Sequence, residues 1–331
     1  MTFLEHSFSD RALLLTLAIF INVLFGGPRW LHLLLHLNAP SQFVKNLFSF
    51  FVIRMNRAHR SDATRRNRGA FIAVIVLVLA LLLGVLVSLL SIQTRMWMLA
   101  ELILLAMMLG IRQSFDLAAE VRKLLSRKEV DAAKRLLQPE VKQDLAPMDE
   151  YAVARAAIEF LGHRLVSGMV SPAFWYFIGG LPLALPAIAM HRLSFFAVRP
   201  IPRYQPFAPV VKAIESFYRA LPTGITVLLM LFVMPVVPGS KGNAARKAAR
   251  EENPQNLLIT DYPVLSVIAR AFGIAVQGPC TVESHPVAYP WIGEGSARLG
   301  PPDILRMQFL YGYAAGVFLL LIAALNLISF K

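Results

Sequence analysis

Long apolar stretches separated by polar segments dominate the pattern of hydrophobic and polar positions in this chain. The stretches that predict membrane helices lie near residues 12–26, 70–90, 96–111, 169–190, 221–237 and 307–330. The stretch at 70–90 is the clearest, because it has no charged residue over the ~20 positions that a helix needs to cross a bilayer. The pattern therefore predicts an all-α fold, a polytopic membrane bundle of about five spans in which one stretch can re-enter instead of crossing.

The stretch at 169–190 differs from the others because glycine and proline interrupt it. The interrupting residues are Pro172, Gly179, Gly180, Pro182 and Pro186. Membrane helices tolerate such breakers mainly where the freed backbone faces protein or a water-lined cavity. We therefore predict a broken or re-entrant helix here, and it is the best pointer in the sequence to a pocket.

Amphipathic helices and one irregular loop account for the rest of the pattern. Residues 43–52 are strongly apolar but too short to cross a bilayer, which indicates an interfacial helix. Residues 112–165 form a soluble helical insert, and 204–219 predict a further amphipathic helix. A shorter apolar helix is expected at 264–276, inside a loop at 239–306 that is polar and basic over 239–256 and Gly- and Pro-rich over 277–302.

Charge adds the orientation of the chain. The net charge is +13 and 56% of the residues are hydrophobic, but the basic excess is concentrated in loops beside the predicted spans. It therefore indicates membrane topology and contact with anionic lipid, and no nucleic acid partner. Eight Lys and Arg residues lie between 28 and 69, against Asp62 alone. We predict a multi-pass protein of the bacterial inner membrane, with 28–69 and 112–165 in the cytoplasm and the N-terminus outside.

Polar clusters flank the broken helix on both sides. The candidate binding residues are His163, Arg164 and Ser167 before it, and His191, Arg192, Ser194, Arg199 and Tyr204 after it. Polar groups at membrane depth need partners, so two such clusters predict a site, and we expect them to converge in space. Interfacial anchoring by snorkelling basic residues explains the same pattern without a ligand.

Other chemical signatures are sparse. Cys280 is the only cysteine, which excludes an intramolecular disulfide and a zinc site built from cysteines. His32 and His36 lie four residues apart and share one face of a helix, which suits a metal, but no carboxylate lies nearby to complete the ligand shell. An interfacial role is favoured for this pair, and the identity of any metal stays open.

Several landmarks resemble the CobD/CbiB family over nearly the whole chain, as a single membrane domain spanning 1–331. From 159 to 222 the family pattern can be laid on without a gap. The landmarks are Gly26-Gly27-Pro28-Arg29-Trp30-Leu31, Pro172-Ala173-Phe174-Trp175, Gly179-Gly180, Tyr204, Leu221-Pro222, Gly278-Pro279, Tyr289-Pro290-Trp291-Ile292-Gly293-Glu294 and Asp303-Ile304. The resemblance implies adenosylcobinamide-phosphate synthase activity in cobalamin assembly, which joins aminopropanol phosphate to adenosylcobyric acid, with Mg²⁺ and ATP as cofactors where that chemistry survives.

The chain departs from the family pattern at its acidic motifs. Where the family has Glu-Asn-Thr-x-Asp-Gly, this chain has residues 163–168, HRLVSG, and a second acidic motif is replaced at 191–200. The family's acid pair becomes Glu215-Ser216. Glu159 and Glu215 therefore remain as the candidate catalytic acids, whereas Glu294 and Asp303 are expected to cap or brace the C-terminal loop.

These replacements change the chemistry that the site can support. Hard cations need clustered carboxylate oxygens, whereas basic side chains favour an anionic ligand. We therefore expect a ligand that carries a phosphate or a carboxylate, or a corrinoid. Two functions follow: a cobalamin-pathway protein with altered chemistry or an assisting role, and a non-catalytic accessory or signalling protein resembling the AmpE branch of the superfamily.

Overall fold

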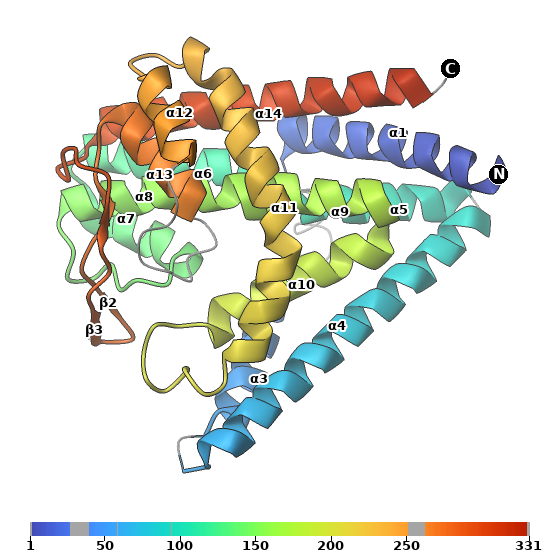
Figure 1. Ribbon diagram of the computed structural model, residues 1–331, viewed down its shortest axis with the longest axis horizontal. Coiled ribbons are helices and arrows are strands. Elements are labelled where there is room, and N and C mark those ends of the chain that lie inside the picture. The colour runs from blue at the N-terminus through green and yellow to red at the C-terminus, as the bar shows by residue number, and fades with distance from the viewer. Residues whose placement is uncertain (1, 27–39, 58, 94, 251–261, 330–331) are drawn as a thin grey trace. The chain divides into compact units, whose positions relative to one another are not determined.

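The computed structural model describes residues 2–26, 40–57, 59–93, 95–250 and 262–329. The first family landmark beyond Gly26, together with His32 and His36, therefore lies outside the described residues. The helices are α1 (Thr2–Phe25), α3 (Pro40–Met55), α4 (Asp62–Gln93), α5 (Arg95–Met108), α6 (Ile111–Ser126), α7 (Val130–Leu137), α8 (Glu150–Leu165), α9 (Ser171–Gly179), α10 (Leu181–Ala197), α11 (Pro209–Val233), α12 (Gly242–Arg250), α13 (Tyr262–Phe272) and α14 (Pro301–Ser329) (Figure 1).

Helices dominate the described chain, as the sequence predicts. Within the described residues, four helical segments are long and apolar enough to cross a membrane, namely Asp62–Ser91, Met96–Ser126, Pro209–Val236 and Pro301–Leu327. Many of their large apolar side chains are exposed, which is the arrangement of a surface that faces lipid. The prediction of an all-α polytopic membrane protein is confirmed, whereas the total number of spans stays a prediction.

The chain divides into two compact units. The first comprises Met1–Gly110, Ser171–Arg219 and Ile322–Lys331, and the second comprises Ile111–Val170 and Ala220–Leu321. The single family domain over the whole chain stays a prediction.

In the first unit, α4 and α10 pack closely against each other. The two backbones come close together at Gly84, where an added Cβ would lie 2.6 Å from the Leu181 carbonyl oxygen and 2.7 Å from the Pro182 Cα. At another contact, the Asn22 side-chain amide on α1 donates to the carbonyl oxygens of Ala106 and Leu109, at 2.8 Å and 2.6 Å. Small residues and satisfied polar groups therefore hold these helices together, as is typical inside membranes.

The predicted break in the Gly/Pro-rich stretch is confirmed. A π-helical turn at Val166–Val170 precedes α9, and α9 ends at Gly179. Gly180 then has φ +66° and ψ −158°, a conformation that side chains with a Cβ disfavour, and Pro182 lies in the first turn of α10. The stretch is thus two helices joined at Gly180.

Two helix boundaries predicted from the sequence are wrong. The helices expected at 204–219 and 221–237 are one continuous helix, α11, which runs through Pro222. Proline has no N–H for the carbonyl four residues earlier, that of Tyr218, but this oxygen accepts a hydrogen bond from Trp175 Nε1 at 2.8 Å. The soluble insert expected at 112–165 also overlaps an apolar segment, because Met96–Ser126 is long and apolar enough to cross a membrane, with a break in the helix at 109–110.

The second unit contains α6, α8, α13 and two short two-stranded sheets. Strand β1 (Val276–Gln277) pairs antiparallel with β4 (Trp291–Ile292), and between them in the chain β2 (Cys280–Val282) and β3 (His285–Val287) form an antiparallel hairpin. The helix predicted over 264–276 is therefore too long: α13 ends at Phe272, because Gly273 turns the chain at φ +65° and the following residues lead into β1.

Candidate functional site

A buried cluster around Glu215 joins α10 to α11 in the first unit. Ser194 Oγ donates to Glu215 Oε2 at 2.7 Å, and His191 Nδ1 lies 3.1 Å from Oε1. Arg219 Nη1 donates to the same Oε1 at 3.3 Å. We call these four residues the Glu215 cluster. Helical periodicity places His191 and Ser194, three residues apart, on one face of α10, and Glu215 and Arg219, four apart, on one face of α11.

The cluster is shielded from solvent and its charges are balanced. Only 6% of Glu215 and 5% of Arg219 is exposed, and Ser194 is also buried. Both carboxylate oxygens accept hydrogen bonds, and a guanidinium neutralises the carboxylate. Such a pair stabilises its own geometry, but it leaves the carboxylate poorly suited to take up a further cation.

Three further predicted binding residues, Arg192, Arg199 and Tyr204, lie in the sequence between members of this cluster. Tyr204 is buried, and the guanidinium carbons of Arg199 and Arg203 each lie 5.9 Å from its ring centroid. Both distances fall within the range of cation–π attraction. Arg192 follows His191 directly on α10 and is half-buried. The basic residues after the broken helix therefore gather partly around an aromatic ring.

The predicted residues before the broken helix lie in the second unit. Arg164 Nε donates to Ser114 Oγ on α6 at 2.9 Å. Ser167 Oγ donates to the His163 carbonyl oxygen at 2.9 Å, inside the π-helical turn. Arg164 and Ser167 thus make local contacts within their unit. Because the other cluster belongs to the first unit, the predicted convergence of the two clusters stays a prediction.

Glu159, the other candidate catalytic acid, also lies in the second unit. It is buried on α8, and its Oε1 accepts a hydrogen bond from the Gln277 backbone N–H at 2.6 Å. Burial raises the pKa of this carboxyl above its ordinary value, although the hydrogen bond from Gln277 and the nearby charges of His163 and Arg155 act in the opposite direction. The contact braces the loop that begins at β1.

A neighbouring residue on α8 holds the same loop at a second point. Arg155 lies one turn before Glu159, with its guanidinium carbon 4.9 Å from the Trp291 ring centroid, and its Nη1 donates to the Ala297 carbonyl oxygen at 3.1 Å. The last two acids bear out a bracing geometry: Asp303 Oδ2 accepts from the Gly300 N–H at 2.9 Å, and the exposed Glu294 lies 3.6 Å from Arg270. None of these contacts resembles a cation site.

The described residues do not fit the Mg²⁺ that the family resemblance implies. In the described part of the chain, no three His, Cys, Asp or Glu side chains come together closely enough to hold a metal ion. Mg²⁺ requires near-octahedral oxygen ligands, whereas the oxygens of Glu215 accept hydrogen bonds from Ser194 and Arg219. No catalytic step through a metal is therefore derived for these residues.

Arg219 is the residue of the cluster that the sequence analysis missed. The signal for it was present, since a basic residue four positions after Glu215 on a predicted helix lies on the same helical face.

Comparison with known proteins supplies the family. The sequence pattern described as CobD/Cbib protein matches residues 15–311. A cobalamin biosynthesis protein CobD from a Sinorhizobium species is 26% identical over 296 residues, covering 88% of this chain and 91% of the relative. A protein of the same name from Photorhabdus laumondii is 25% identical over 303 residues, covering 91% of this chain and 92% of the relative.

A third relative, also named cobalamin biosynthesis protein CobD, comes from Pelobacter propionicus and is 26% identical over 323 residues, covering 94% of this chain and 95% of its own. No solved structure matches the chain. The matched range contains the positions of both candidate acids and of both polar clusters that flank the broken helix. This chain belongs to the CobD/Cbib protein family.

Proposed function

We propose that this chain is a membrane protein of cobalamin biosynthesis that binds an anionic group but does not carry out the metal-dependent amide formation expected of an adenosylcobinamide-phosphate synthase. Its relatives over most of the chain are named cobalamin biosynthesis proteins, which supports the pathway. The single observation behind the loss of the reaction is the Glu215 cluster, where Ser194 and Arg219 hydrogen-bond to the two oxygens of the remaining acid.

The expected synthase reaction joins a carboxylate to an amine, and the oxygen that the carboxylate loses leaves on the phosphate that is cleaved from the nucleotide. Its cation would need free carboxylate oxygens together with phosphate oxygens from the substrates. In this chain, basic and neutral residues stand at the positions of the family's acidic motifs, and Arg219 adds a further cation beside Glu215. This arrangement favours a phosphate- or carboxylate-bearing ligand and disfavours a metal-bound nucleotide.

A second function, a non-catalytic accessory protein like those of the AmpE branch, draws support from the same cluster. A carboxylate held by a serine and an arginine within one unit stabilises a fold without needing a ligand. The two functions differ in whether loss of the chain changes cobalamin levels.

Growth of a synthase-deleted strain on adenosylcobyric acid tests the proposal. We expect this chain, as the sole family member, to give no rescue, whereas the strain's own synthase, returned in the same vector, is the positive control. Feeding the amide product should restore growth in every strain. Robust rescue that disappears on Glu215→Gln would show that the reaction is retained and would overturn the non-catalytic assignment.

Deletion of the chain from its own host separates the two functions. A lowered cobalamin content, restored by the wild-type chain, supports a role in the pathway. An unchanged content under conditions in which the host depends on its own synthesis would contradict the pathway assignment and support an accessory function elsewhere.

A further inference from the structure

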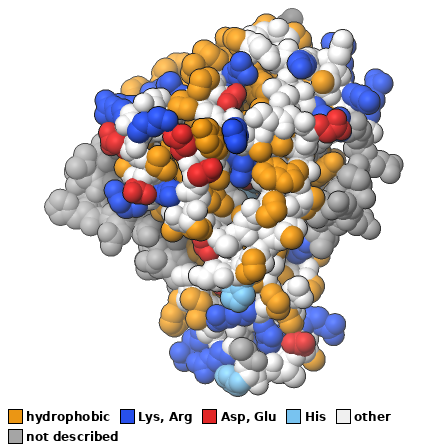
Figure 2. Space-filling view, turned by 90° about the vertical axis from the view of Figure 1, so that its left-hand side faces the viewer, with side chains coloured by type: hydrophobic (Ala, Val, Ile, Leu, Met, Phe, Trp, Pro, Cys, Tyr) orange, Lys and Arg blue, Asp and Glu red, His pale blue; other side chains and the backbone are white. Residues whose placement is uncertain are grey.

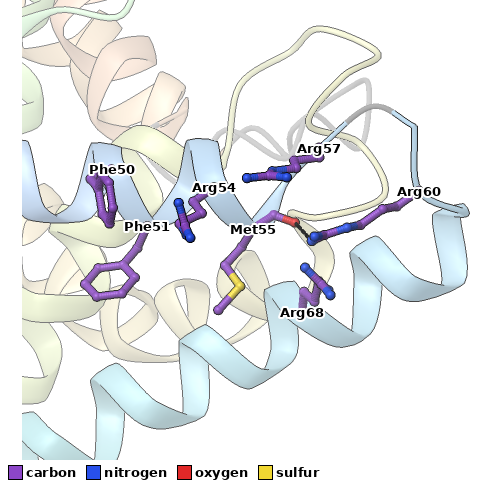
Figure 3. A pocket seen from close by; sticks show the side chains of 7 residues that line it. All are labelled: Phe50, Phe51, Arg54, Met55, Arg57, Arg60 and Arg68. Carbon is purple, nitrogen blue, oxygen red and sulfur yellow. Dashed lines mark hydrogen bonds between the residues drawn. The ribbon is translucent and has the colours of Figure 1, made fainter.

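A pocket rich in arginine lies in the first unit, between the end of α3 and the start of α4 (Figure 3). Its volume is about 330 Å³, which is at the small end of the ~300–1,000 Å³ range of ligand pockets. Its lining includes Arg54, Arg57, Arg60, Arg68, Phe50 and Met55. Figure 2 shows Lys and Arg side chains gathered at the lower end of the view, at the height where α3 and the first turns of α4 lie in Figure 1.

The four arginines carry no matching negative charge in the described part of the chain. Arg60 Nη1 donates to the Met55 carbonyl oxygen at 3.4 Å, and the Arg54 guanidinium carbon lies 5.9 Å from the Phe50 ring centroid. Neither contact neutralises a charge. The nearest acid in sequence, Asp62, forms its ion pair with Arg65 at 3.3 Å instead. Four cations around one small cavity repel one another, so the pocket has a strong preference for an anion.

A brace behind the pocket fixes its shape. Arg65 is buried; its Nε donates to Asn56 Oδ1 at 2.9 Å, and its Nη2 donates to the Arg203 carbonyl oxygen. The Asn56 side chain donates to the same carbonyl oxygen at 3.1 Å. These bonds tie the end of α3 and the first turn of α4 to each other and to the connection between α10 and α11. Arg54 on α3 and Arg68 on α4 are therefore presented by two helices whose ends are held together.

The surroundings of the pocket identify the source of the anion. Arg68 is followed within one turn by Phe71, which is 57% exposed, and the apolar side of α4 continues through the exposed Leu79 and Leu82. On α3, Phe50 and Ile53 are also exposed. The pocket thus lies at the basic end of a helix that is able to cross a membrane, next to the start of its apolar part. In a membrane this is the level of the lipid headgroups.

We propose that this pocket binds the phosphate group of an anionic membrane lipid. Arg57, Arg60 and Arg68 contact the phosphate oxygens, because guanidinium groups pair with phosphate through charge-assisted hydrogen bonds. The acyl chains lie along the exposed apolar side chains of α3 and α4. This site is separate from the Glu215 cluster and does not depend on the proposed function.

Lipid binding to the purified full-length chain tests the site. Native mass spectrometry in detergent would count bound phosphatidylglycerol, with phosphatidylcholine as the zwitterionic comparison. We expect Arg68→Gln to weaken phosphatidylglycerol binding about tenfold, as the loss of one charge-assisted contact predicts. Arg66→Gln is the matched control, because it removes the same charge from the same helix but does not line the pocket, and it should change binding less than about twofold.

Arg57→Gln provides a second variant, since Arg57 is exposed and lies outside the brace. Equal losses in the Arg66 variant and the pocket variants would mean that general surface charge binds the lipid, and would overturn the proposal. A further experiment measures the binding of inorganic phosphate from the shift that it causes in the thermal unfolding temperature of the protein. Phosphate binding as tight as that of the lipid, with the same dependence on Arg68, would assign the pocket to a soluble anion and refute the lipid as its occupant.

Discussion

At the residue scale, Glu215 shows how neighbours decide what a carboxylate can do. Its position matches one member of the family's acid pair, yet it lies between a serine on α10 and an arginine on its own helix. A buried carboxylate held in this way is stabilised mainly by its partners, and its partners depend on it in return. Removal of one member therefore leaves the other charged and buried.

Substitution of Glu215 by glutamine should destabilise the chain by about 3 kcal/mol, because the Arg219 guanidinium loses its counter-charge in a buried site. The denaturation midpoint of the protein in detergent would measure the change. Glu294→Gln is the matched control: its side chain is 85% exposed, so the expected change is within about 0.5 kcal/mol. Equal stability of the two variants would mean that Glu215 is not part of a structural pair.

The pH dependence of stability should report on Glu159. Burial raises its folded pKa above the ordinary value of 4.5, so the folded chain binds this proton more tightly than the unfolded chain does. The contribution of Glu159 to stability is therefore greatest below pH 4.5 and is lost as pH rises through the raised folded pKa.

Glu159→Gln cannot titrate and keeps an oxygen for the Gln277 N–H. We expect the stability of this variant relative to wild type to increase between about pH 4 and about pH 7. Chemical denaturation at both values measures the difference, and Glu129→Gln, a substitution of an exposed acid, should show no such trend. A difference that stays constant with pH would contradict the raised pKa.

Individual site residues could be chosen from the sequence, but most of their partners could not. Arg219 was accessible, since helical spacing alone places it beside Glu215. The partner of Glu159 is a backbone N–H at Gln277, in a loop far along the chain, and no residue pattern identifies a main-chain donor. The same holds for Ser114, which reaches Arg164 from another helix.

At the element scale, the turn between α9 and α10 requires a residue without a Cβ at Gly180. Gly180→Ala should destabilise the chain by about 1–3 kcal/mol, because its φ of +66° and ψ of −158° strain any residue that has a Cβ. The denaturation midpoint in detergent measures this loss. In contrast, Gly224→Ala in α11 should be neutral or stabilising by up to about 1 kcal/mol, since a Cβ there meets no atom within 4 Å. A neutral Gly180→Ala would contradict the strained turn.

Glycine and proline content predicted this break correctly, but it also predicted a break before Pro222 where α11 is continuous. In the 169–190 stretch, Gly180 and Pro182 together end one helix and begin the next. Pro222 alone does neither, because a neighbouring side chain satisfies the carbonyl that it leaves without a partner in the helix. Composition thus identifies places where a helix can break, whereas tertiary contacts determine whether it does.

At the scale of the whole molecule, the basic connection between α3 and α4 predicts the orientation of the chain in the membrane. With Asp62 in the cytoplasm, a cysteine placed there on a Cys280-free background should resist an impermeant thiol reagent in intact cells and react after permeabilisation. Labelling in intact cells would reverse the orientation. A cysteine at Arg135, in the insert between Ile111 and Val170, should behave in the same way.

The hydrogen bond from Trp175 to the Tyr218 carbonyl links two landmarks that are separate in the sequence. Pro222 removes the N–H that would otherwise occupy this oxygen, and the indole of the Pro-Ala-Phe-Trp landmark takes its place. Selection on Trp175 and on Pro222 is therefore coupled. Among relatives, we expect the two residues to covary: where another residue replaces the proline, its N–H can bond to this carbonyl oxygen, and tryptophan is no longer required at the other position.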